Sequence, residues 1–222
     1  MSNLNLTIRK AIKSDIPFLI KAIIEADKSG TTNSSYCNLL SISEDEFYTI
    51  LVDIFEEELE EVEFGYESFF VLVNDINKPI ACCASWIEGR DGVPSWQKRM
   101  MALRTFASKQ SIDHLLSLQN EIKGFMPERT PNTIQIESVY VDLKYRGLGY
   151  VSYLLNYVFN TYIESIGEGL LVEVMTYSSN NSAIKVYQKL GFTISEQTII
   201  KSDVVNKIYS SDGMIKFEKK YN

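Results

Sequence analysis

The sequence has little cysteine, histidine or excess positive charge. Its 222 residues include three cysteines and one histidine, and 22 Lys and Arg face 29 Asp and Glu, which gives a net charge of −7. The cysteines, Cys37, Cys82 and Cys83, have no zinc-site spacing and are too few for a disulfide framework. Nucleic acids and anionic membranes require a concentrated cationic surface, so the charge balance argues against both as partners.

Long apolar runs are also missing. No stretch approaches the roughly 18 apolar residues of a membrane span, and the opening MSNLNLTIRKAIKSD lacks the apolar core of a signal peptide. We therefore expect a reduced, cytoplasmic protein. With 45% hydrophobic and 23% charged residues, the chain suits one domain over residues 1–222.

The first half of the chain predicts alternating strands and helices. A strand is expected over Leu4–Arg9, then a helix that Asp15 caps, then a loop over Lys28–Ser41. Ser43 with Glu46 forms a capping-box pattern before a second helix. The glutamates from Glu56 to Glu63 are typical of a solvated helix face, or of a surface that attracts a cationic substrate.

Two apolar stretches, Ser68–Val73 and Ile80–Ile87, predict a hairpin around the turn at residues 74–77. Residues 89–132 then have no strand character, and their apolar spacing indicates two helices. This segment could elaborate the domain, shape a pocket or form a dimer contact, and periodicity does not choose among them.

The second half has stronger periodicity. A strand over Thr133–Val141 precedes a one-faced helix from Val151 to Ile166, which Gly167 ends. The remaining chain predicts a strand, a short helix and two further strands, over Leu170–Met175, Ser182–Leu190, Phe192–Ile200 and Met214–Lys219. This order is typical of an α/β layered architecture.

The most informative segment lies between the strand that ends at Val141 and the long helix. It reads Tyr145-Arg146-Gly147-Leu148-Gly149-Tyr150-Val151-Ser152. Two glycines at such a junction allow a tight turn that directs several backbone N–H groups at one anion, reinforced by the helix dipole. A pyrophosphate is the natural ligand, although a tight turn can require glycines without any ligand.

A second informative segment runs from Asn180 to Phe192. The two together resemble the GCN5-related N-acetyltransferase (GNAT) family, whose signature is Arg/Gln-x-x-Gly-x-Gly/Ala followed by Asn-x-x-Ala-x-x-x-Tyr-x-x-x-Gly-Phe. Val151 departs from the small final residue of the first part. The second part is matched in full, by Asn180, Ala183, Tyr187, Gly191 and Phe192.

The resemblance implies a mixed β-sheet that is splayed at its centre and flanked by helices, with residues 89–132 as a helical insertion between the third and fourth strands. It also implies acetyl-CoA as acyl donor. The pantetheine arm would pair with Val139, Tyr140 and Val141 of the fourth strand, and the pyrophosphate would bind the loop. The implied loop residues are Arg146, Gly147, Leu148, Gly149, Tyr150, Val151 and Ser152, and Asn180 would approach the pantetheine arm.

The resemblance further implies acyl transfer to an amine. Tyr187 matches the family's acid by position, although a tyrosine there can equally be packing. Glu137 is the best candidate for the base, because a carboxylate among apolar strand residues is desolvated. Its other interpretation is structural, as a solvated glutamate at the sheet edge or an ion-pair partner. Glu173 on the next strand is a weaker candidate, and no metal-ligand pattern is visible.

Two other functions compete with this one. Gly147-x-Gly149-x-x-Ser152, with Glu173 about 20 residues on, resembles a dinucleotide-binding turn but lacks its last glycine. A non-catalytic acyl-CoA sensor or partner-binding module on the same fold is the second alternative. The acceptor is left open by the residues, and the acidic composition favours a small cationic amine. A homodimer is possible, since many relatives of this kind form dimers.

Overall fold

The computed structural model describes residues 6–167 and 169–221. Within them lies a seven-stranded sheet with the order β1-β2-β3-β4-β5-β7-β6. Every pairing is antiparallel except that of β4 with β5, which is parallel. The strands are β1 Thr7–Lys10, β2 Phe69–Val73, β3 Pro79–Ile87, β4 Ile134–Val141, β5 Leu170–Tyr177, β6 Thr193–Ile199 and β7 Gly213–Tyr221. The predicted mixed α/β sheet is confirmed, and the mostly parallel sheet of a dinucleotide-binding fold is not what these strands form.

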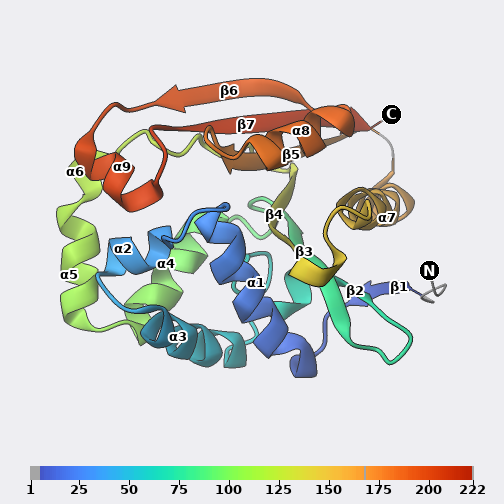
Figure 1. The fold of residues 1–222 in the computed structure, drawn as a ribbon, viewed down its shortest axis with the longest axis horizontal. Helices are drawn as coiled ribbons and strands as arrows, with labels where there is room; N and C mark the ends of the chain where they lie inside the picture. Colours follow the sequence, from blue (N-terminus) through green and yellow to red (C-terminus); the bar gives the residue numbers. More distant parts are fainter. Residues whose placement is uncertain (1–5, 168, 222) are drawn as a thin grey trace.

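The sheet opens between β4 and β5 (Figure 1). These strands pair only at Ile134–Val172, Gln135–Glu173 and Ile136–Val174. The pairing of β3 with β4 shifts register at the same level, and Ser138 has the positive φ of 48° there. A bulge bends a strand away from its neighbour. The last residues of β4 therefore diverge from β5.

The first helices are α1 Ile16–Lys28, α2 Ser35–Leu40 and α3 Glu44–Glu56. The prediction that Asp15 caps α1 is wrong in its detail, because the Asp15 side chain makes no cap bond. It accepts instead from Arg9 Nη1 at 2.6 Å and from the N–H of Ile12 at 2.9 Å. Asp15 thus joins β1 to the entry of α1. Leu4 and Asn5 of the predicted first strand lie outside the described residues.

The predicted loop over Lys28–Ser41 is wrong for its second half, which is helix α2. Ser34 begins that helix by accepting from the N–H of Cys37 at 3.3 Å. A helix of six residues is too short to show apolar periodicity, so its N-cap was its only signal.

The capping box at Ser43 and Glu46 is confirmed. The glutamate run after it is not a solvated helix face, because α3 ends at Glu56. Glu61 accepts from the N–H of Ile87 at 2.8 Å, and Glu63 is 5% exposed. The end of this run therefore belongs to the interior.

The segment at residues 89–132 forms α4 Ser95–Phe106, α5 Lys109–Ser117 and the short α6 Gln119–Ile122, one helix more than predicted. Buried carboxylates hold both ends. Glu88 accepts from Ser95 and from Trp86 Nε1 at 3.0 Å. Glu173 on β5 accepts from the N–H of Thr130 at 3.1 Å. The inserted helices are thereby fixed against the sheet.

The later helices are α7 Tyr150–Ile166, α8 Asn181–Lys189 and α9 Asp203–Tyr209. The first two follow the prediction closely, and α9 was missed because seven residues carry little periodicity. One hydrophobic core packs α7 and α8 against the sheet. A second core packs the five helices from α1 through α5 against β2 and β3. Short 3-10 turns lie at Lys13–Asp15, Tyr66–Ser68 and Leu143–Tyr145.

Among the residues that the structure describes, we find no helix with the length and apolar character needed to cross a membrane.

Candidate functional site

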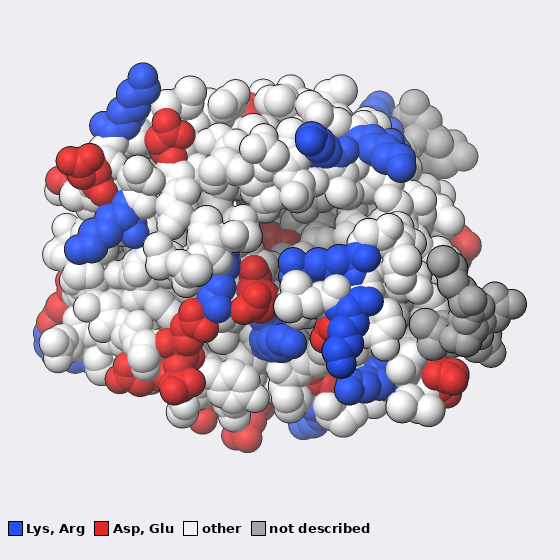
Figure 2. All heavy atoms as spheres, in the orientation of Figure 1, with Lys and Arg blue, Asp and Glu red and all other residues white. Residues whose placement is uncertain are grey.

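A cavity of about 310 Å³ lies where β4 and β5 diverge. Figure 2 shows the surface hollowed near the centre of this face, and red side chains gather at the lower left of the hollow. Residues of α1, α2, β4, β5, α8 and the inserted helices line the cavity. One space therefore touches both the predicted donor elements and residues of the two stretches, 28–41 and 89–132, that follow α1 and β3.

Four of the predicted site residues share this cavity wall: Glu137, Val139, Asn180 and Tyr187. They come from β4 and from the start and middle of α8. Tyr140 and Val141 are buried beside it without lining it. The fold therefore brings together strand and helix residues that lie 41 or more positions apart in the sequence.

Tyr187 packs its ring between Phe192 and Phe217, at centroid distances of 6.1 and 5.8 Å. The residue is 6% exposed and lines the cavity. Burial raises the pKa of this phenol above its ordinary value, because the phenolate would be desolvated. Tyr187 is therefore protonated at neutral pH and has a proton to donate.

Glu137 is half of an ion pair. Its Oε1 is paired with Arg129 Nη2, and its Oε2 lies 3.9 Å from Arg99 Nη1. Oε2 is buried and has no hydrogen-bond donor among the described residues. Of the two interpretations that the sequence allowed, ion-pair partner and base, the first is present, and the free Oε2 leaves a lone pair for the second.

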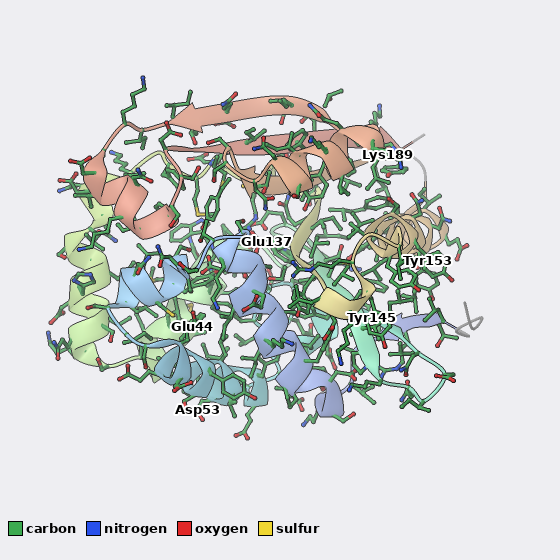
Figure 3. The ribbon with its side chains drawn as sticks, in the orientation of Figure 1. Glu44, Asp53, Glu137, Tyr145, Tyr153 and Lys189 are labelled. Atoms are coloured by element: carbon green, nitrogen blue, oxygen red, sulfur yellow. The ribbon has the colours of Figure 1, made fainter. Side chains whose placement is uncertain are left out.

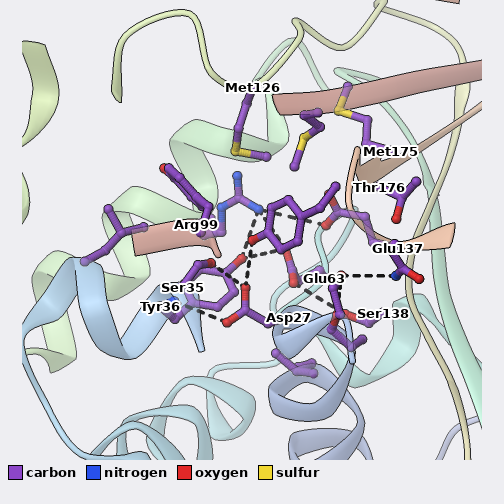
Figure 4. Close-up of a pocket in the computed structure, with 18 of the residues that line it drawn as sticks. Asp27, Ser35, Tyr36, Glu63, Arg99, Met126, Glu137, Ser138, Met175 and Thr176 are labelled. Carbon is purple, nitrogen blue, oxygen red and sulfur yellow. Dashed lines mark hydrogen bonds and ion pairs between the residues drawn. The ribbon is translucent and has the colours of Figure 1, made fainter. Parts of the chain in front are cut away.

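A second carboxylate, Glu63, lies near Glu137 on the same Arg99 guanidinium (Figure 4). Arg99 Nη1 donates to Glu63 Oε2 at 2.7 Å and to the Tyr36 hydroxyl at 3.2 Å. Tyr36 donates in turn to Glu63 at 3.0 Å. Burial would lower the pKa of Arg99, but the neighbouring Tyr36 and Glu63 raise it overall, so the guanidinium stays charged. Burial lowers the pKa of Arg129 to about 10, which leaves it charged at neutral pH as well.

Asp27, near the end of α1, has partners of another kind. It accepts from the hydroxyls of Ser34, at 2.6 Å, and Ser35, from the N–H of Tyr36 at 3.2 Å and from the Tyr177 hydroxyl at 3.4 Å. Burial raises the pKa of Asp27 above its ordinary value, although the donors at Ser34, Ser35 and Tyr36 oppose this shift. All four partners are neutral.

The glycine segment forms the predicted turn before α7. Gly147 and Gly149 both have φ of 79°, which L residues with a side chain rarely adopt. A Cβ placed on either glycine would meet no atom within 4 Å. Within the described residues, no hydrogen-bond acceptor serves the N–H groups from Gly147 to Ser152. The turn thus presents open space beside free donors.

The other loop residues divide into two groups. Val151, Tyr145 and Tyr150 pack against the core between α7 and the sheet, so the branched side chain of Val151 points inward. Leu148 is 56% exposed. Arg146 donates from Nε to the Val141 carbonyl at 3.0 Å, which holds the turn against the end of β4. The sequence left the orientation of Val151 open, and packing decides it.

Both the oxygen and the nitrogen of the Asn180 side-chain amide form hydrogen bonds within the protein. Its Oδ1 accepts from the N–H of Ala183 at 3.1 Å and caps α8, and its Nδ2 donates to Ser29 Oγ at 3.3 Å. It lies on the cavity wall nonetheless. Asn180 therefore joins the end of α1 to the start of α8 on the donor side of the cavity.

Several other residues singled out in the sequence lie away from the cavity. Glu173 on β5 is fully buried beside β4, where Gln135 Nε2 donates to it at 2.8 Å. Cys82 and Cys83 are both fully buried, and burial raises the pKa of Cys83 to about 12. His114 on α5 does not line the cavity. Across the described residues, no cluster of His, Cys, Asp and Glu could hold a metal ion.

The polar wall of the cavity was not predicted: Asp27, Tyr36, Glu63 and Arg99 line it, and Arg129 is paired with Glu137 behind it. These residues come from α1, α2, the segment before β2, α4 and the segment before β4. No local motif links them. Only Glu63 had a signal, since it ends the glutamate run that could attract a cationic substrate.

A family model described as "Acetyltransferase (GNAT) family" matches residues 37–192. The chain therefore belongs to the GNAT acetyltransferase family and is an acyltransferase, which confirms the resemblance read from Arg146 to Ser152 and Asn180 to Phe192. None of the curated proteins matches the sequence.

Solved structures of acetyltransferases share the fold. An N-acetyltransferase from Staphylococcus aureus has a TM-score of 0.63 at 18% identity, covering 96% of this chain and 100% of its own. An agmatine N-acetyltransferase has a TM-score of 0.56 at 12% identity, covering 97% and 99%. The ribosomal-protein-S18-alanine N-acetyltransferase from Escherichia coli has 0.51 at 13%, covering 98% and 94%. Their named acceptors differ, and identities this low show the fold alone.

Proposed function

We propose that this protein transfers the acetyl group of acetyl-CoA to the primary amine of a small cationic molecule, by direct attack in a ternary complex. The observation that carries the proposal is the cavity at the β4–β5 opening, which Tyr187 and Glu137 line together. An acid and a base that face one space are what amine acylation requires.

Acetyl-CoA is proposed to bind along the end of β4 and over the turn before α7. Val139 to Val141 are no longer paired with β5, so this edge of β4 is proposed to bind the pantetheine arm, except at the Val141 carbonyl, which accepts from Arg146. The N–H groups of residues 147–152 stand at the start of α7 with open space beside both glycines. Free donors at a helix N-terminus suit a pyrophosphate. Asn180 is proposed to face the pantetheine arm from α8.

The chemistry follows from the state of the amine. An aliphatic amine is protonated at neutral pH and must lose a proton before it attacks a thioester. Glu137 is proposed to accept that proton on Oε2, the oxygen that Arg129 does not hold. A backbone N–H of the bulged part of β4 stabilises the oxyanion that forms. Tyr187 donates a proton to the departing thiolate, and the second amine proton returns to Tyr187 through solvent.

The whole chain, residues 1–222, is proposed to act as one acetyltransferase domain, with residues 89–132 as an insertion on the acceptor side. Arg99, Met100, Leu103 and Leu115 of the inserted helices line the cavity opposite the donor elements, which supports this role. A homodimer and a cytoplasmic location stay predictions of the sequence.

Two measurements test the proposal. Calorimetry with acetyl-CoA should give saturable binding, and a panel of amines should release CoA thiol only when acetyl-CoA and an amine are both present. Binding without release for every amine would identify a sensor and contradict the transferase mechanism. Absence of binding would contradict the donor site itself.

A further inference from the structure

The cavity contains one carboxylate whose charge no cation balances. Glu63 is paired with Arg99 at 2.7 Å, and Glu137 is paired with Arg129. Asp27 forms no ion pair with any Lys, Arg or His of the described residues, and its four donors are neutral. The pairs cancel, so the fixed charge of the cavity wall is that of Asp27. A carboxylate without a cationic partner in such a site is disfavoured in its charged form, and an ammonium bound beside Asp27 would supply the missing charge.

The rest of the wall is mostly apolar. Apolar side chains of α2, of the inserted helices and of the segment after them line it: Leu39, Leu40, Leu103, Leu115, Ile122 and Met126. Figure 4 shows Met126 and Met175 on the side of the cavity away from Asp27. A second ammonium placed among these side chains would lose its hydration without gaining a counter-ion. The volume of about 310 Å³ is that of a small-molecule site.

We propose that Asp27 binds the ammonium group of the acceptor, and that the cavity selects an amine with one positive charge and an apolar body. This inference rests on the proposed function and names the acceptor class for it. Arg99 reinforces the selection, because its guanidinium lines the cavity and would repel a second cation on the acceptor. Glu63 is a weaker anchor for a cation than Asp27, since the guanidinium of Arg99 already balances its charge.

The surroundings of Asp27 hold its carboxylate in place. Ser34 and Ser35 begin α2, and their hydroxyls donate to opposite oxygens of Asp27. Tyr177, on β5 at the sheet opening, donates from the other side. Asp27 therefore lies between the acceptor side of the cavity and the strands at which the thioester is proposed to lie. It acts on specificity and binding, whereas Glu137 takes the proton.

The test uses the full chain saturated with CoA and three small probes that differ in the number of their ammonium groups. 2-Phenylethylamine carries one ammonium on an apolar body, 2-phenylethanol is its neutral analogue, and 1,4-diaminobutane carries two ammonium groups. Calorimetry should show the wild type binding 2-phenylethylamine at least about tenfold more tightly than either other probe. The alcohol lacks the charge that strengthens a hydrogen bond to Asp27, and the second ammonium of the diamine would lose its hydration. Tighter binding of the diamine or of the alcohol would overturn the inference.

The variant Asp27→Asn keeps the shape and removes the charge. Its affinity for 2-phenylethylamine should fall at least about tenfold, while its affinity for 2-phenylethanol stays the same. Asp53→Asn is the matched control, because Asp53 lies on the outer side of α3 (Figure 3) and should change neither value. Equal affinity of Asp27→Asn and wild type for the amine would overturn the inference.

The proposed function fails in a different way. If acetyl-CoA is not bound, or no amine releases CoA, the transferase mechanism is contradicted. The probe affinities, measured then on the chain without CoA, still decide the role of Asp27. If Asp27→Asn folds poorly, the preference of the wild type among the three probes tests the inference without it. With turnover, Asp27→Asn should raise KM for the amine and change kcat by less than about threefold, which a proton-transfer residue would not do.

Discussion

Glu137 of β4 and Arg129, which follows the inserted helices, form an ion pair whose two side chains are 16% and 9% exposed. The pair fixes one oxygen of the proposed base and leaves the other without a donor. It also ties the end of the insertion to the strand at which the sheet opens. The same contact therefore serves the stability of the fold and the geometry of the site.

Removal of Arg129 is expected to destabilise the protein strongly. Arg129→Ala leaves Glu137 with only the longer 3.9 Å contact to Arg99. Loss of one partner of a buried pair costs about 3–5 kcal/mol when no other cation is near, so we expect a cost up to that size. Arg104→Ala is the control, because Arg104 lies on α4 and is exposed. Urea denaturation of both variants measures the difference. A cost for Arg129→Ala no larger than that for Arg104→Ala would mean that the pair adds nothing to stability.

Replacement of Tyr187 by phenylalanine is expected to slow the reaction without weakening donor binding. The ring keeps its contacts with Phe192 and Phe217, and only the proton donor is lost. We expect kcat to fall by roughly 10²-fold at unchanged acetyl-CoA affinity. Tyr153→Phe, on the exposed face of α7, is the control. A Tyr187→Phe variant that turns over at the wild-type rate would leave Tyr187 as a core residue.

Gly149→Val is expected to weaken acetyl-CoA binding at least tenfold, about 1.4 kcal/mol. A branched side chain would fill the open space where the pyrophosphate is proposed to lie, and would strain a residue with φ of 79°. Gly92→Val separates these effects, because Gly92 has φ of 84° and open space but lies in the insertion. Calorimetry on both variants gives the answer. Similar losses in the two would show strain alone.

The reaction rate with a cationic amine is expected to fall as salt is added. Exposed charges are screened over about 10 Å at 0.1 M ionic strength, which reduces the attraction of a protein of charge −7 for a cation. We expect kcat/KM to decrease steadily from ~20 to ~300 mM NaCl. A neutral competitor such as 2-phenylethanol should inhibit equally throughout. A flat salt profile for the amine would reduce the acidic composition to a solubility effect.

Asp27 is expected to make stability depend on pH. Its pKa is raised in the folded protein, so the folded chain holds a proton at pH values where the unfolded chain has released it. Wild-type stability therefore declines as pH rises from about 4 through the folded pKa. Asp27→Asn lacks this decline, so its Tm relative to wild type should increase between pH 4 and 7. A constant difference across that range would contradict the raised pKa.

The sequence predicted the strands and the long helices well where the pattern is local. The one-faced apolar periodicity of α7, the capping box at Ser43 and the hairpin of β2 and β3 depend on neighbours within a few residues. The short helices α2, α6 and α9 were missed or merged, because four to seven residues carry too little periodicity. The Asp15 carboxylate accepts from Arg9 and does not cap α1. This choice of partner depends on where β1 lies, which local sequence does not show.

The residues of the donor side also lie in short segments of the sequence. Residues 146–152 and 180–192 each form one turn and one helix start, so their spacing in the sequence is their spacing in the fold, and the family model covers both. Asn180 and Tyr187 could be named in advance for that reason, and Glu137 and Val139 because they lie on the strand that precedes the glycine turn. Their roles are still the subject of the predictions above.

The sequence by itself determined the family, the order of the main elements and the positions that face acetyl-CoA in the proposed site, because each follows from short-range patterns. The tertiary structure decided the acceptor side. Asp27, Glu63, Arg99 and Arg129 have no motif and meet only after the sheet opens and the inserted helices pack across it. These long-range ion pairs decide which carboxylate is left without a cationic partner. The partners are far apart in the sequence, so no local pattern predicts them.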